Sequence, residues 1–167
     1  EFFTSNNNRG FNVFDKILYI NLEHRKDRKT QILNEFKKMD ILEDKIHRID
    51  AVHEKYNGHI GCAKSHIKTI EFAKKNNFKT VAVFEDDFVF TEEKLVVFKK
   101  INDFLNNFKG KWDIIQLTTV FKTLYDTNHD SVKKVESATT SSAYIINSNF
   151  YDKLINILKE SLGKMEK

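Results

Sequence analysis

The 167-residue chain contains no proline, five glycines and a single cysteine, Cys62. A single cysteine excludes an intrachain disulfide and is weakly typical of a reducing compartment. No apolar run approaches the roughly 20 residues of a membrane-spanning helix. The first ten residues lack the basic start and apolar middle of a signal peptide. The sequence therefore predicts a chain without a transmembrane segment, located in the cytoplasm or in a host-cell interior.

The charge is mixed, with 28 basic and 24 acidic residues and a net charge of +4. The basic residues are spread along predicted helices rather than gathered in a stripe with aromatic residues, so nucleic-acid binding is not predicted. A small positive excess suits either an ordinary solvated surface or a polyanionic ligand such as a diphosphate. The length fits one domain. We expect a poorly ordered leader over residues 1–15 and a single domain over residues 16–167.

Segments with strand and helix patterns alternate along the chain. Strands are predicted within residues 16–21, 45–51, 80–88, 112–117 and 142–147, and helices within residues 25–39, 62–76, 92–108 and 148–162. A turn is expected at residues 58–61, a helix cap at Thr91, and a polar loop from the strand at 112–117 to residue 130. This alternation favours an α/β fold with a mostly parallel sheet flanked by helices.

The apolar strand that begins near residue 80 runs directly into three carboxylates, Glu85-Asp86-Asp87. Alternate residues of a strand share a face, so we expect Glu85 and Asp87 to point together and Asp86 to point away. Two neighbouring carboxylates suit a hard cation, Mn²⁺ or Mg²⁺, which often shares its ligand shell with substrate phosphates. The alternative interpretation is a solvated acidic turn at the end of a strand.

Two strand ends earlier in the chain suggest a nucleotide site. After Asn21, Arg25 and Arg28 open a helix and could bind phosphate, although they could equally pair with nearby acids. Asp50 ends the next strand, where it could accept a hydrogen bond from a ribose or cap a turn.

The segment at residues 58–66 places glycines before a helix, where backbone can approach a ligand closely. Ser65 and His66 fall in the first turns of that helix. Cys62 and His66 could also suggest a nucleophile–base pair or a zinc site. Because the chain has no second cysteine, we expect Cys62 to be a small buried thiol instead.

Together these segments resemble glycosyltransferase family 25, which includes lipooligosaccharide sugar transferases and collagen galactosyltransferases. The resemblance extends from about residue 16 to about residue 162, with the motifs in the family's order. It rests on Ile20-Asn21-Leu22 with Arg25 and Arg28, Arg48-Ile49-Asp50-Ala51-Val52, Gly61-Cys62-Ala63-Lys64-Ser65-His66, Phe84-Glu85-Asp86-Asp87, Trp112-Asp113-Ile114-Ile115-Gln116-Leu117 and Ser142-Ala143-Tyr144-Ile145-Ile146.

The resemblance implies a GT-A-like (Rossmann-like) fold and an inverting, metal-dependent hexosyltransferase. The donor would be a UDP-sugar carrying galactose or glucose, with Mn²⁺ as cofactor or Mg²⁺ in its place. The acceptor would be a hydroxyl on a glycan, a lipooligosaccharide or a hydroxylysine in a collagen-like chain.

By the same resemblance, Glu85 and Asp87 would bind the metal. The nucleotide-sugar site would comprise Asn21, Leu22, Arg28, Asp50, Ser65, His66 and Glu85. No counterpart of the family's later Asp-containing segment appears before residue 167, so no catalytic base is assigned. A non-catalytic nucleotide-sugar-binding domain, or a fragment of a larger enzyme, is the alternative function.

Overall fold

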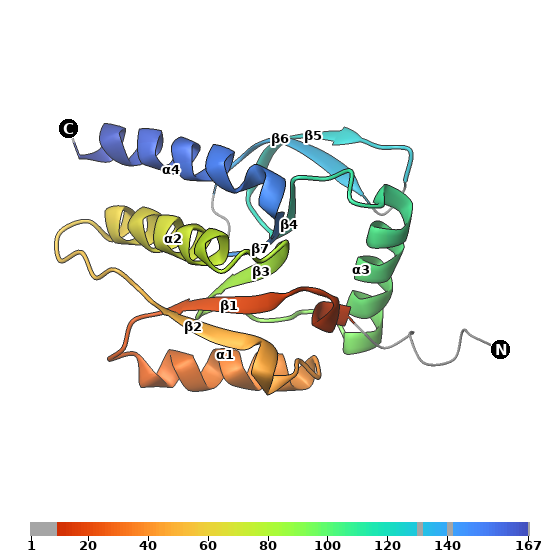
Figure 1. Cartoon of the computed structure of the whole chain (residues 1–167), viewed down its shortest axis with the longest axis horizontal. Helices are drawn as coiled ribbons and strands as arrows, with labels where there is room; N and C mark the ends of the chain where they lie inside the picture. The colour runs from red at the N-terminus through yellow and green to blue at the C-terminus, as the bar shows by residue number, and fades with distance from the viewer. Residues whose placement is uncertain (1–9, 130–131, 140–141, 167) are drawn as a thin grey trace.

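The computed structural model describes residues 10–129, 132–139 and 142–166. In these ranges a five-stranded sheet lies between two layers of helices (Figure 1). The strands of the sheet are β1 (Lys16–Asn21), β2 (Ile46–Asp50), β3 (Thr80–Glu85), β4 (Ile114–Thr118) and β7 (Ala143–Asn147). The helices are α1 (Lys26–Lys38), α2 (Gly58–Lys75), α3 (Lys94–Phe108) and α4 (Tyr151–Met165), with short 3-10 turns η1 (Gly10–Val13), η2 (Glu43–Lys45) and η3 (Ser148–Phe150).

The sheet is mixed, in the order β2-β1-β3-β7-β4. β1 pairs in parallel with β2 and with β3, whereas β7 runs antiparallel to both of its neighbours, β3 and β4. The predicted α/β class, a mixed sheet flanked by helices, is therefore confirmed. The more specific GT-A-like assignment stays a prediction.

Side chains that alternate along the central strands form one hydrophobic core on each face of the sheet. In β1, Ile17 and Tyr19 pack toward the layer of α1 and α3, whereas Leu18 and Ile20 pack toward α2 and α4. Figure 1 shows α2 and α4 side by side over one face, with α1 below the other. Burial on both faces explains why these strands are continuous apolar runs in the sequence.

Most predicted elements appear near their expected positions, with three corrections. The expected turn at residues 58–61 is the first turn of α2, because the side chain of Asn57 accepts a hydrogen bond from the His59 N–H and caps the helix. The expected cap at Thr91 is wrong, since α3 begins after Glu93. The predicted loop contains a hairpin, β5 (Phe121–Asp126) with β6 (Lys133–Ala138).

Only residues 10–15 of the expected leader over residues 1–15 are described by the structure. Residues 1–9 lie outside the described residues. From residue 10 the chain is ordered as η1, and Phe11 and Phe14 are buried in the core beneath α3 and β3. The ring of Phe11 packs edge-on against Phe84 of β3, with 5.6 Å between centroids. This stretch therefore contributes to the packed domain.

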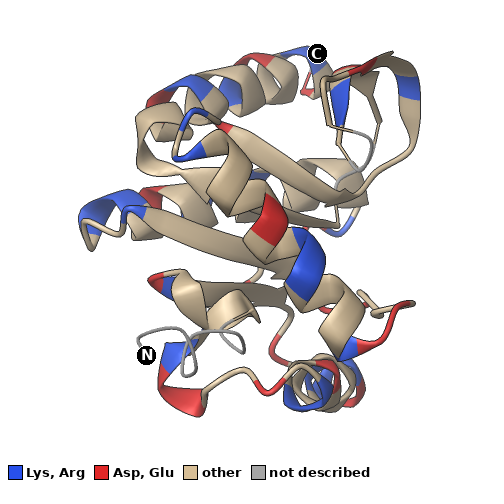
Figure 2. Cartoon of the chain, turned by 90° about the vertical axis from the view of Figure 1, so that its right-hand side faces the viewer, with Lys and Arg blue, Asp and Glu red and all other residues tan. Residues whose placement is uncertain are grey.

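The surface carries interspersed charge, as its composition predicts. In the view of Figure 2, basic and acidic stretches are scattered over several helices and loops, with most of the chain between them uncharged. In the described ranges, no helix is both long enough and apolar enough to cross a membrane.

Candidate functional site

The carboxyl ends of the three parallel strands meet at one edge of the sheet. β1 ends at Asn21, β2 at Asp50 and β3 at Glu85. The strand register places Asn21 beside Asp50, and Ile20 beside Glu85. In open α/β sheets this edge is where ligands bind, because loops diverge there toward helices on both faces.

A cavity of about 270 Å³ opens at this edge. Its lining includes aliphatic groups from Leu22 and Val52, two arginines (Arg25 and Arg28), and the start of α2 at Gly58. Its size is close to the lower end of about 300–1,000 Å³ that is usual for small-molecule sites. The combination of apolar and cationic lining suits a ligand with a ring at one end and an anion at the other.

The three consecutive carboxylates separate onto two sides of the sheet. Because β3 ends at Glu85 and the chain then turns, with the Phe88 N–H donating to the Glu85 carbonyl at 3.3 Å, strand alternation does not continue to Asp87. Glu85 lies on the α2 side, and both Asp86 and Asp87 face Arg28 of α1. The expected pairing of Glu85 with Asp87, with Asp86 turned away, is therefore not the arrangement of these side chains.

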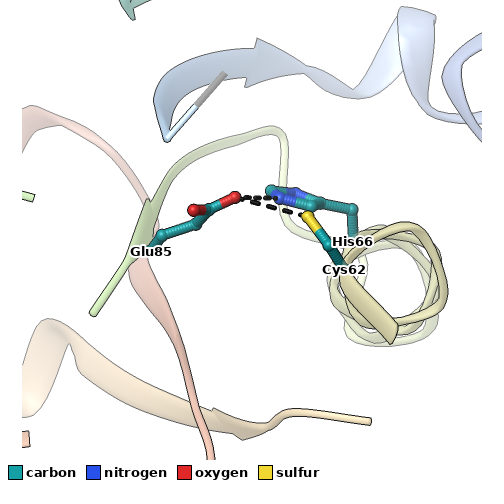
Figure 3. Close-up of side chains that lie close together, drawn as sticks. All are labelled: Cys62, His66 and Glu85. Carbon is teal, nitrogen blue, oxygen red and sulfur yellow. Dashed lines mark hydrogen bonds and ion pairs between the residues drawn. The ribbon is translucent and has the colours of Figure 1, made fainter. Parts of the chain in front are cut away.

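Glu85 lies beside His66 and Cys62, which occupy successive turns of α2 (Figure 3). The Glu85 carboxylate is 3.1 Å from Nε2 of His66 and 3.5 Å from Sγ of Cys62. Burial by itself raises the pKa of Glu85, but hydrogen bonds from the imidazole and the thiol outweigh it and lower that pKa below its usual value. Glu85 is therefore ionised at neutral pH.

Cys62 is exposed, so the expectation of a buried thiol is wrong. Its Sγ nevertheless points toward Glu85 at the cavity wall (Figure 3). Shielding of the thiol from water, together with the negative charge of Glu85, raises the pKa of Cys62 to about 12. The free thiol is consequently protonated and a poor nucleophile.

Tyr144 of β7 contacts His66 on the side of the imidazole that faces away from Glu85. Its hydroxyl lies 3.0 Å from Nδ1 of His66, and burial raises the pKa of Tyr144 far above its usual value. The hydroxyl therefore stays protonated and holds the imidazole in one orientation. In the sequence, Tyr144 belongs to an apolar strand motif, and that pattern does not indicate that its hydroxyl lies at the site.

Asp86 is almost completely buried and joins β1, α1 and β3. Its carboxylate accepts a hydrogen bond from Nδ2 of Asn21 at 2.7 Å and another from Nη1 of Arg28 at 3.2 Å. The same Nη1 atom donates to Asp87 at 3.0 Å. A guanidinium thus neutralises two of the three acids that the sequence places at the strand end.

Arg25 and Arg28 differ in their partners. Arg25 makes two hydrogen bonds to Asp27, at 3.0 and 2.7 Å, as the alternative interpretation of these arginines anticipated. Arg28 instead points to the acidic strand end. Both line the cavity, so both can reach an anion bound there.

The remaining predicted site residues divide between lining the cavity and supporting it. The lining includes Leu22, Arg28, Ser65, His66 and Glu85, but Asn21, Asp50 and Asp87 are not part of it.

Ser65 connects the loop after β2 to the first turn of α2, because its hydroxyl accepts a hydrogen bond from the Val52 N–H and donates one to the Gly61 carbonyl. Gly61 is needed at this contact, since a Cβ there would lie 2.7 Å from the Val52 oxygen. Asp50 pairs with Arg48 at 3.2 Å.

A second cavity, of about 210 Å³, lies near the start of β3, at the opposite edge of the sheet. Lys74, Phe78 and Tyr151 line it, and Lys74 is already paired with Asp152. The carboxyl ends of the parallel strands do not meet at this second cavity, as they do at the first.

Comparison of the chain with models of known protein families gives one match. The family model described as "Glycosyltransferase family 25 (LPS biosynthesis protein)" matches residues 56–165. The matched stretch contains the Cys62, His66 and Glu85 cluster, whereas β1, α1 and β2 precede it. A search of curated proteins found no match.

Proposed function

The chain belongs to glycosyltransferase family 25 and is a glycosyltransferase, and on this basis we propose that it transfers galactose or glucose from a UDP-sugar to an acceptor hydroxyl. The acceptor class is a glycan, a lipooligosaccharide or a hydroxylysine. The observation that supports this proposal is the cavity at the carboxyl ends of three parallel strands, with two arginines and an ionised glutamate in its wall.

The lining of the cavity matches the parts of a nucleotide sugar. Leu22 and Val52 offer apolar contact for the uracil and ribose. The guanidinium groups of Arg25 and Arg28 are suited to a diphosphate, because their planar donors match phosphate oxygens. The N-terminal end of α2 adds partial positive charge at Gly58.

The residues at the strand end also fit a hard dication such as Mn²⁺. One oxygen of Asp86 and one of Asp87 approach the same nitrogen of Arg28, at 3.2 and 3.0 Å. A cation therefore already occupies the space between two carboxylates, and oxygen ligands are those that Mn²⁺ and Mg²⁺ prefer. A metal ion held by Asp87 and Asp86 would supply positive charge to the leaving diphosphate.

The protein's own groups position the donor and control charge around it. Arg28 offers a cation that can shift from the carboxylates to the diphosphate when a donor binds. His66, oriented by Tyr144, keeps Glu85 ionised and fixed in direction. The acceptor oxygen then attacks the anomeric carbon from the side opposite the diphosphate, which inverts the configuration at that carbon. No catalytic base is assigned among these residues.

A thermal-shift titration with UDP, UDP-galactose and UDP-glucose, with and without Mn²⁺, tests the donor site. We expect UDP to raise the melting temperature of the wild-type protein and to have little effect on Arg28→Ala. Lys29→Ala is the matched control, because it removes one positive charge from the next, exposed position of α1. Equal stabilisation of both variants by UDP would contradict the proposed diphosphate contact.

Transfer itself is tested by UDP release in the presence of glycan and hydroxylysine-containing peptide acceptors. Release of UDP that depends on an acceptor is the expected result. Binding of UDP without release from either sugar nucleotide would favour the alternative, a nucleotide-sugar-binding domain or a part of a larger enzyme. The absence of an assigned catalytic base is the observation that keeps this alternative open.

A further inference from the structure

A sulfur, a nitrogen and an oxygen atom lie close together at the wall of the cavity: Sγ of Cys62, Nε2 of His66 and Oε1 of Glu85 (Figure 3). All three lie within 4.8 Å of one another, with 3.5 Å from sulfur to oxygen and 3.1 Å from nitrogen to oxygen. In a tetrahedral zinc site, bond lengths of about 2.3 Å to sulfur and about 2.0–2.1 Å to nitrogen or oxygen place the ligand atoms about 3.3–3.6 Å apart. The sulfur–oxygen and nitrogen–oxygen distances are therefore close to those of a zinc site.

The backbone holds these atoms in place. Cys62 and His66 are four residues apart in α2, so they project from the same side of the helix, and Glu85 ends the buried strand β3. A metal ion would thus join a helix to a strand that are already packed together.

The second nitrogen of the imidazole has the partner that a metal-binding histidine requires. When Nε2 binds a metal, Nδ1 carries the proton and must donate it to an acceptor. The hydroxyl oxygen of Tyr144, 3.0 Å from Nδ1, is placed to accept that hydrogen bond.

The chemistry of the donor set selects the ion. A thiolate, an imidazole and a carboxylate together suit Zn²⁺, whereas Mn²⁺ and Mg²⁺ prefer sites made of oxygen ligands. The three side chains also line the cavity, which leaves a fourth coordination position open to water or a ligand. Three protein ligands and an open fourth position are typical of catalytic zinc sites, whereas structural zinc sites are closed by four protein ligands.

We propose that Cys62, His66 and Glu85 form a binding site for Zn²⁺, separate from the oxygen-ligand pair of Asp86 and Asp87. The thiol releases its proton to solvent as the sulfur–zinc bond forms. The thiolate and the carboxylate then balance the two positive charges of the ion. The inference concerns metal binding alone and does not depend on the proposed sugar transfer.

Cobalt substitution is the most direct test, because tetrahedral Co²⁺ absorbs in the visible range and a thiolate ligand adds a near-ultraviolet charge-transfer band. Metal-free, tag-free protein should bind one Co²⁺ per chain with both features, and one equivalent of Zn²⁺ should remove them. A large excess of Mn²⁺ should not. Cys62→Ser should abolish the charge-transfer band.

Zinc affinity is then measured by competition with a chromogenic chelator. Tyr144→Phe removes only the outer hydrogen bond and should weaken zinc binding about 10–100-fold while keeping the charge-transfer band. Cys62→Ser and Glu85→Gln each remove a ligand and should weaken it at least as much. The controls are Asp87→Asn and His53→Ala, which change a nearby carboxylate and a nearby imidazole outside the cluster and should bind zinc as the wild type does.

Cobalt binding without the charge-transfer band would overturn the proposal, as would unchanged zinc affinity in both Cys62→Ser and Glu85→Gln. Loss of zinc binding in His53→Ala alone would place the ion on surface histidines instead. Circular dichroism of each variant establishes that it is folded. Because no nucleotide is present in these measurements, failure here leaves the UDP-binding result unaffected.

Discussion

Gly61→Ala is expected to destabilise the protein, although alanine is the better helix former. Gly61 lies in the first turn of α2, where the helix passes close to the loop that follows β2. A Cβ on residue 61 would lie 2.7 Å from the backbone oxygen of Val52 and 3.3 Å from Glu54. The contact at Val52 involves main chain, which cannot rotate away as a flexible side chain would.

The size of the effect follows from two opposing terms. Replacing glycine by alanine in a helix gains at most about 1 kcal/mol. Forcing an extra carbon into a packed contact costs about 1–3 kcal/mol. Moving α2 away would also strain the Ser65 hydroxyl, which bridges Val52 and Gly61 at 2.8 and 2.7 Å. We therefore expect a net loss of up to about 2 kcal/mol in the free energy of unfolding.

Gly58→Ala is the matched control within the same helical turn. A Cβ there meets nothing within 4 Å, so only the favourable helix term remains. Urea denaturation followed by circular dichroism gives the free energy of unfolding of both variants. The m-value should be unchanged, because the unfolded chain and the buried surface stay nearly the same.

The result that would refute this reasoning is a Gly61→Ala variant as stable as Gly58→Ala. It would mean that the close approach of α2 to the loop after β2 does not exist in solution. The shape of the cavity, which both Gly61 and Val52 line, would then need revision as well.

Three further predictions concern other parts of the fold. Asp86→Asn should lower the free energy of unfolding by about 2 kcal/mol in urea denaturation, because it removes the buried carboxylate that pairs with Arg28. Asp87→Asn removes the more exposed partner of the same arginine and should lower it by at most about 1 kcal/mol. Equal losses in the two variants would contradict the difference in burial. Partial shielding from water beside Phe72, with a smaller contribution from a nearby lysine, lowers the pKa of His47, although the residue as a whole is exposed. The folded state therefore disfavours the charged imidazole, and stability should decline slightly as the pH falls below about 6.5. His47→Phe should reduce that decline in a pH series of thermal melts. Phe11→Ala should lower the free energy of unfolding by about 3–5 kcal/mol in urea denaturation, because the ring is fully buried. A loss below about 1 kcal/mol would show that this segment does not pack on the sheet.

The sheet could be predicted from the sequence because its strands are buried on both faces. The predicted strand over residues 16–21 is β1, and the one predicted over residues 80–88 is β3, which ends three residues earlier; both are short apolar runs that end in polar residues. Their ends also predicted the edge where the cavity lies. The hairpin β5–β6 was missed because most of its residues are exposed, so it lacks the apolar alternation that identifies a half-buried strand.

The sequence predicted which strand ends meet at this edge of the sheet, but not how their side chains are arranged. Strand alternation was extended to Asp87, although β3 ends two residues earlier, at Glu85. The position of a strand end depends on tertiary contacts, which sequence periodicity does not encode. The contact between Cys62 and Glu85 could not be predicted from the sequence either, because 23 positions separate the two residues and only the packing of α2 on β3 brings them together.

The end of β3 separates its acidic residues into two chemically different environments. Asp86 and Asp87, with the cation of Arg28 between them, offer oxygen ligands on the α1 side. Glu85, on the α2 side, lies within hydrogen-bonding distance of a thiol and an imidazole.

A hard ion and a thiophilic ion would therefore be expected on different sides of one strand end, and each would add positive charge near a bound diphosphate. Comparing Mn²⁺ and Zn²⁺ in Asp87→Asn and Cys62→Ser separates these effects, because each substitution should impair binding of one ion and spare the other. Loss of both ions in either variant would mean that the three carboxylates act as a single site.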